Sequence, residues 1–223
     1  MTRTLHRTLL LAALATAPAL TPAALAQPAN PPPATRPAAA NPAAAPAPDD
    51  GLGAQDREVL AAAQALAKEA SQVMEQWIIS QASTEDRLFS RLYFPVPKTD
   101  PLKFSTPYDT LADHDLVGPE DKALARSNAW QYAIITDTNG YVPAHNTRFA
   151  QAPTGVTAQD YVNNRTKRMF GDLASIKAAR NEKPFLIQLV QLETGDLIYD
   201  LSVPVMVRGK HWGCARIGFR RSE

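Results

Sequence analysis

The carboxyl-terminal forty residues constrain the fold most, because they form three segments with the period of β-strands. Apolar residues alternate with other residues over 184–192, 197–208 and 211–219, and a period of two places alternate side chains on opposite faces of a sheet. A Thr-Gly pair separates the first two segments, and the Gly-Lys pair at 209–210 fits a two-residue type II′ turn. The sequence therefore predicts an antiparallel sheet.

The alternation gives this sheet two unlike faces. One face is hydrocarbon and needs a cover: Phe185, Ile187, Leu189, Tyr199, Leu201, Val203, Val205, Val207, Ala215, Ile217 and Phe219. The other face is mixed: Leu186, Gln188, Val190, Asp200, Ser202, Met206, Trp212, Cys214 and Arg216. Charges such as Asp200 and Arg216 are costly to bury unpaired. The mixed face therefore indicates a small-molecule pocket or an internal Asp200–Arg216 ion pair without a ligand.

Residues 55–81 predict a long helix, because good helix formers carry an apolar seam there. The seam is Leu60, Ala63, Ala67, Ala70, Met74, Trp77 and Gln81. Val59, Leu66 and Val73 widen it, as a helix that covers a sheet requires. The same heptad spacing is typical of paired helices, so a homodimer through this helix stays an alternative use.

The middle of the chain contains fewer regular patterns. Four prolines break residues 84–118, which we expect to be irregular but ordered, and residues 119–126 predict a short helix. Residues 131–137 predict another strand. Asn139 and Gly140 follow it and predict a hairpin turn.

A helix is also predicted over residues 157–170, with Thr157 as its N-cap. It would place Arg165 on an apolar stripe, where a guanidinium can bind both oxygens of a carboxylate. The alternative is that Arg165 reaches solvent or pairs with a nearby carboxylate. Lys167 and Arg168 are expected to be solvated.

His145 and Asn146 follow the predicted hairpin and are expected at the mouth of the pocket, although a lone histidine is as well explained by a structural hydrogen bond. Tyr141 and Trp212 would form walls. The candidate ligand-binding residues are Arg165, Asp200, Gln188, Arg216, Tyr141, His145 and Trp212. No nucleophile elbow or other catalytic motif is present, so we do not expect an enzyme.

The amino-terminal part predicts export. Residues 1–26 combine a basic start, an apolar stretch and a small-residue cleavage site, which together indicate a signal peptide. Residues 27–53 are rich in Pro and Ala and predict a disordered linker, and residues 54–223 predict a single domain of ordinary size. The expected location is the periplasm.

Charge and cysteine content argue against a nucleic-acid partner, an internal disulfide and covalently attached haem. The formal net charge is +1, whereas a nucleic-acid partner would favour a strong basic surplus. The single cysteine, Cys214, allows no internal disulfide and no Cys-x-x-Cys-His haem attachment. We expect Cys214 to be buried, and we expect no cofactor or metal.

Four segments resemble one family in order and spacing: DTNGYVPAHN (137–146), NNRTKRMF (163–170), AARNEKPFLIQ (179–188) and LSVPVMVRGKHWGCARIGF (201–219). They resemble the extracytoplasmic Cache (PAS-like) sensor domain of methyl-accepting chemotaxis proteins over about residues 84–219. The resemblance implies an α+β fold with an antiparallel sheet of five to six strands and a long N-terminal helix on one face. It also implies a pocket on the other face for a small molecule, often a carboxylate or amino acid.

The sequence departs from that family in two places. Only four residues follow Phe219, so we expect no second membrane helix or methylated bundle, and Cys214 stands where the family has glycine. The expected protein is a secreted, free-standing sensor-type domain that binds a carboxylate-bearing molecule without catalysis. It would report to a membrane receptor or kinase partner. The alternative is a ligand-free envelope module that docks or dimerises through the long helix.

Overall fold

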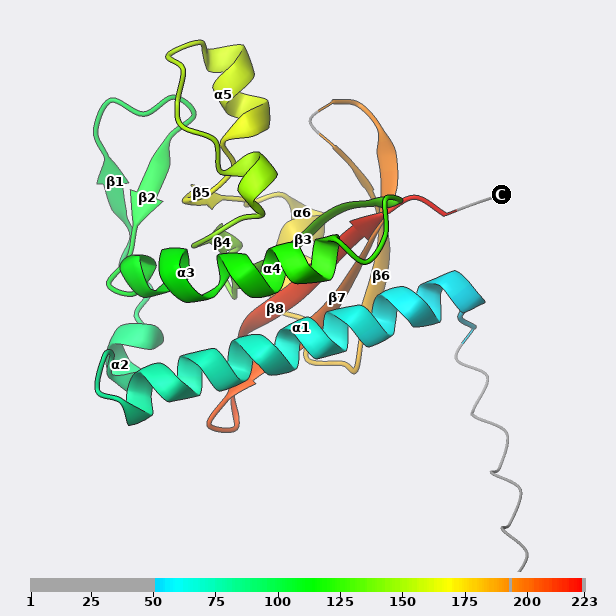
Figure 1. The fold of residues 1–223 in the computed structure, drawn as a ribbon, viewed down its shortest axis with the longest axis horizontal. Helices are drawn as coiled ribbons and strands as arrows, with labels where there is room; N and C mark the ends of the chain where they lie inside the picture. Colours follow the sequence, from blue (N-terminus) through cyan, green and yellow to red (C-terminus); the bar gives the residue numbers. More distant parts are fainter. Residues whose placement is uncertain (1–50, 193, 222–223) are drawn as a thin grey trace, which may run out of the picture. The chain divides into compact units, whose positions relative to one another are not determined.

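The computed structural model describes residues 51–192 and 194–221 (Figure 1). These residues form an α+β fold, as predicted, with helices packed around an antiparallel sheet. The predicted signal peptide (1–26) and most of the predicted linker (27–53) lie outside the described residues.

The main sheet has four strands in the order β3-β8-β7-β6, all antiparallel. The strands are β3 (Trp130–Asp137), β6 (Leu186–Gln191), β7 (Leu197–Val207) and β8 (Lys210–Phe219). The expectation of five to six strands is therefore wrong for this sheet. The remaining short strands pair with each other in two separate ribbons, β1 (Phe94–Val96) with β2 (Lys103–Ser105) and β4 (Tyr141–Val142) with β5 (Arg168–Met169).

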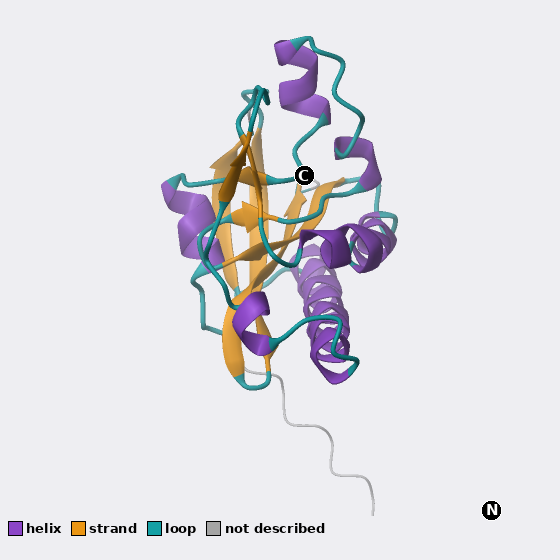
Figure 2. Cartoon of the chain, turned by 90° about the vertical axis from the view of Figure 1, so that its left-hand side faces the viewer, coloured by secondary structure: helices purple, strands orange, loops and turns teal. Residues whose placement is uncertain are grey.

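The hydrocarbon face of the sheet is covered by α1 (Ala54–Ile79), the long helix that the sequence predicts (Figures 1 and 2). Its buried residues are Asp56, Val59, Ala62, Ala63, Leu66, Ala67, Ala70, Met74 and Trp77. All of them except Asp56 share one core with Leu201, Val203 and Ile217 of the sheet. The helix therefore uses most of its apolar seam within its own domain.

The segment predicted to be irregular contains short regular elements. They are α2 (Glu85–Leu88), the β1–β2 ribbon and α3 (Asp109–Asp115). The predicted short helix follows as α4 (Val117–Leu124), which packs beside α1 and against β3. Prolines limit the length of these elements but do not prevent them.

Both predicted tight turns differ in detail. Val207 pairs with Lys210, so the β7–β8 loop is Arg208–Gly209, and both residues have positive φ (50° and 75°). This is the type I′ pattern, one residue earlier than predicted. A turn near Asn139 is present, but the strand after it pairs with β5 and not with β3.

Asp137 and Gly140 explain why the chain reverses after β3. The Asp137 carboxylate accepts hydrogen bonds from the backbone N–H groups of Asn139 (2.9 Å) and Tyr141 (3.0 Å). Gly140 has φ of 76°, and a Cβ there would lie 2.2 Å from the carbonyl oxygen of Phe170. Only glycine fits this approach, which brings the 168–172 segment against the turn.

The helix predicted over residues 157–170 is only half as long in the structure. Helix α5 (Thr157–Asn163) has Val156 as its N-cap and ends before Arg165, because the chain then runs through a turn into β5. A further helix, α6 (Leu173–Ala179), was not predicted. It lies on the mixed face, where its Ala178 and Ala179 pack on Cys214.

Candidate functional site

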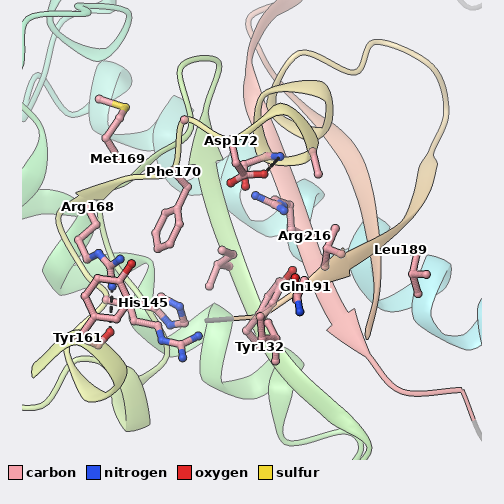
Figure 3. A pocket seen from close by; sticks show the side chains of 17 residues that line it. Tyr132, His145, Tyr161, Arg168, Met169, Phe170, Asp172, Leu189, Gln191 and Arg216 are labelled. Atoms are coloured by element: carbon pink, nitrogen blue, oxygen red, sulfur yellow. Dashed lines mark hydrogen bonds between the residues drawn. The ribbon is translucent and has the colours of Figure 1, made fainter. Parts of the chain in front are cut away.

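A pocket of about 520 Å³ lies on the mixed face of the sheet (Figure 3). Its floor comes from β3, β8 and β6, and its roof comes from the end of α5, β5 and the start of α6. The residues that line it are Tyr132, Ile134, His145, Tyr161, Arg165, Arg168, Met169, Phe170, Gly171, Asp172, Ala174, Ser175, Leu189, Val190, Gln191, Leu192 and Arg216. The volume suits a small organic molecule.

One end of the pocket is cationic. Arg165, Arg168 and His145 all line it, and each is more than 90 % buried. Figure 3 shows Arg168, Tyr161 and His145 grouped on one side, across from Arg216 and Asp172. Guanidinium groups in such a sheltered place attract an anion more strongly than they would in water.

Aromatic rings hold both arginines. The Arg168 guanidinium carbon lies 4.4 Å from the ring centre of Tyr161 and 4.9 Å from that of Phe170. The Arg165 guanidinium carbon lies 4.6 Å from the ring centre of Phe149, and its Nε donates to the carbonyl of Val162 (2.9 Å). Stacking of this kind orients the fork of a guanidinium before a ligand arrives.

His145 is 2 % exposed, and its Nδ1 has no hydrogen-bond partner among the described residues. Burial lowers the pKa of His145 well below its usual value of 6.5, and the positive charges of Arg165, Arg148, Arg168 and Lys103 lower it further. The imidazole is therefore neutral at pH 7. A buried polar atom without a partner is costly, and this cost falls on a residue of the pocket wall.

The opposite end contains Arg216, which forms a buried ion pair with Asp200. Arg216 donates from Nη2 (3.0 Å) and Nε (3.2 Å) to the Asp200 carboxylate, which also accepts from the Tyr132 hydroxyl (2.8 Å). Burial acts to lower the pKa of Arg216, but the charge of Asp200 outweighs it, so the pKa is raised. Asp200 is thus satisfied behind the floor and does not line the pocket.

The carboxylate of Asp172 lies at the rim and caps α6, where it accepts from the N–H of Ser175 (3.0 Å). Desolvation opposes its ionisation, but this hydrogen bond and nearby Arg216 keep the pKa of Asp172 below its usual value. This end of the pocket therefore carries charges of both signs, whereas the Arg165–Arg168 end is positive.

Besides Asp200, three of the predicted ligand-binding residues do not line the pocket: Gln188, Tyr141 and Trp212. The amide of Gln188 donates to the carbonyl of Ala174 (2.9 Å) and ties β6 to α6. The Tyr141 hydroxyl lies 2.9 Å from both Asp109 carboxylate oxygens, in the core. None of these contacts faces the pocket.

Trp212 lies in the core covered by α1, and its indole N–H donates to the carbonyl of Leu88 (3.0 Å). A β-bulge explains this placement, because Val205 pairs with Gly213 whereas Met206 pairs with His211. Trp212 is the extra residue of the bulge, so strict alternation does not hold at this point.

The structure therefore places Arg165, His145 and Arg216 in one pocket, with Arg216 at the opposite end and Asp200 behind it. Asn146 does not reach the pocket mouth: its Oδ1 accepts from the N–H of Ala133 (2.9 Å) on the edge of β3. Arg168 was expected to be solvated, which is wrong, since it is 7 % exposed. The only sequence signal was Phe170 two positions later, because Tyr161, the other ring that stacks on Arg168, is seven residues earlier.

Cys214 and the acidic side chains also have positions that can be compared with their predicted roles. Cys214 is buried beneath α6, as predicted, and burial raises its pKa to about 12. Within residues 51–192 and 194–221, no group of three or more His, Cys, Asp or Glu side chains is placed to hold a metal ion. In the same residues, no helix is both long enough and apolar enough to cross a membrane.

Comparison with known proteins adds no assignment to these observations: no family model matches the chain, and no curated protein matches it either.

Proposed function

We propose that this protein binds a small organic carboxylate with an apolar body in the pocket on the mixed face, and that it does so without covalent chemistry. The observation that carries the proposal is the grouping of Arg165, Arg168 and His145 at one end of a 520 Å³ pocket, where the Nδ1 of His145 has no hydrogen-bond partner among the described residues. The carboxylate would bind at this end. Ile134, Met169 and Phe170 offer apolar surface for the rest of the ligand.

We also propose that the domain is a secreted sensor or capture domain of the Cache (PAS-like) type. An antiparallel sheet with a long helix on one face and a pocket on the other supports this proposal. The domain would act in the periplasm and report to a membrane receptor or kinase partner.

Docking or dimerisation through the long helix receives less support. Apart from Ile79 at the end of the helix, the exposed positions of α1 are polar or small, including Glu58, Gln64, Lys68 and Gln72. Helices that pair need an apolar stripe. The homodimer stays a prediction.

A thermal-shift screen of the full chain against aliphatic and aromatic carboxylates tests the proposal. A ligand at one hundred times its Kd stabilises the folded state by about 2.7 kcal/mol, which for a domain of this size raises the Tm by about 5–10 °C. Neutral amides of the same acids should give no shift.

Two variants identify the site. Arg168→Gln should remove most of the shift, whereas Arg126→Gln, an exposed arginine outside the pocket lining, should keep it. If no carboxylate raises the Tm, or if Arg168→Gln responds like the unmodified protein, the proposal is wrong.

A further inference from the structure

His145 is placed unlike a structural histidine. It lies in the pocket wall, its Nδ1 has no partner in the described part of the chain, and its ring contacts the ring of Phe149 edge-on, with 5.1 Å between centroids. A structural histidine normally fixes its ring through a hydrogen bond.

The groups that face His145 are cations from several elements. They are Lys103 of β2, Arg148 of η1 (Thr147–Phe149), Arg165 after α5 and Arg168 of β5. A proton on His145 would add a fifth positive charge to these four cations, of which Arg165 and Arg168 are buried.

The neighbouring carboxylates are engaged elsewhere. Asp121 accepts from Thr147, Asp160 accepts from Thr154 and Gly155, and Asp172 caps α6. No described carboxylate is therefore placed to stabilise a protonated His145. A bound anion would change this balance, because it brings a negative charge beside the imidazole and its oxygens can accept a hydrogen bond.

We propose that the pocket takes up its carboxylate together with a proton, which His145 accepts, so that acidification tightens binding. The inference rests on the proposed function and adds its regulation. Binding shifts the equilibrium His145 + H⁺ towards the imidazolium, and no bond other than N–H forms.

The sign of the effect follows from linkage. Without ligand, the pKa of His145 is depressed, and the ligand's negative charge raises it. Between these two values, the complex binds one proton more than the free protein, so affinity rises by up to about ten-fold for each unit by which the pH falls. The carboxylate probes are mostly ionised above about pH 5, because carboxylic acids titrate between about pH 4 and pH 5.

The experiment measures the Kd of benzoate and of acetate for the full chain by calorimetry from about pH 5 to about pH 8. At each pH, buffers of different ionisation enthalpy report the protons taken up. We expect tighter binding and proton uptake as the pH falls. His145→Gln should bind with a Kd independent of pH, and His114→Gln, whose side chain is 86 % exposed, should keep the pH dependence.

The possible outcomes are distinct. Binding with no proton uptake, or pH dependence retained in His145→Gln, overturns the inference but leaves the proposed function intact. Failure of both probes at every pH overturns both. Should His145→Gln fail to fold, NMR titration of His145 in the unmodified protein decides, because the inference requires benzoate to raise its pKa.

Discussion

The carboxyl group of Glu120 in α4 offers a sharp test of the packing between α4 and β3. The side chain is 0 % exposed, Oε1 accepts from the N–H of Ile135 (2.9 Å), and Oε2 has no partner among the described residues. Burial raises the pKa of Glu120 well above its usual value, and Asp121 raises it further, against the opposing effects of Ile135 and Lys167. Glu120→Gln keeps the acceptor and the shape but removes the ionisable group.

The magnitude follows from proton linkage. A raised pKa in the folded state means that the unfolded chain releases the proton first, so Glu120 destabilises the fold above its unfolded pKa of about 4.3. The variant should match the unmodified protein below that pH. Above it, its advantage should grow by about 1.4 kcal/mol per pH unit, up to the folded-state pKa.

Urea unfolding of both proteins at a series of pH values measures this difference. Glu58→Gln, at an exposed position of α1, controls for the loss of a negative charge. If the two curves of unfolding free energy against pH run parallel, the reasoning is refuted. It is also refuted if the variant becomes less stable than the unmodified protein as the pH rises.

Three further predictions concern the sheet. Asp200→Ala leaves Arg216 buried without its partner and should cost about 3–5 kcal/mol in urea unfolding; an unchanged midpoint would contradict the buried pair. Gly213→Ala places a Cβ 2.0 Å from a backbone oxygen of β3 and should lower the free energy of unfolding by about 3 kcal/mol or more. The control is Gly118→Ala in α4, where a Cβ meets nothing within 4 Å, and it should raise the free energy of unfolding by about 0.5 kcal/mol. Equal effects of the two substitutions would show that the close approach at Gly213 is absent. The Cys214 thiol, with its pKa raised to about 12 by burial, should resist a disulfide reagent at pH 8 until urea unfolds the protein, and rapid native labelling would place it at the surface.

Sequence pattern was sufficient where one periodicity extended over many residues. Helix α1 and strands β6, β7 and β8 were predicted within a few residues of their observed bounds, because each buries a face whose spacing is visible in the sequence. The buried pair of Asp200 and Arg216 also followed from alternation. It was one of two alternatives, and the structure contains both the pair and a pocket beside it.

Prediction failed where a single residue changes the geometry. The bulge at Trp212 moves one side chain from the mixed face to the core, and alternation cannot show an extra residue. The chain leaves the helical path after Asn163, where Asn164 donates to the carbonyl of Gln151 (2.7 Å). That partner is distant in sequence, so local propensity extended the helix over Arg165 and Arg168.

Strand β8 contributes side chains both to the pocket and to the core beneath α1. Arg216 lines the pocket, while Ala215 and Ile217, its immediate neighbours, lie in the core beneath α1. A ligand that moved Arg216 would therefore also move Ala215 and Ile217, on which α1 packs. If the pocket binds the proposed ligand, only the backbone of β8 separates that ligand from the core beneath α1.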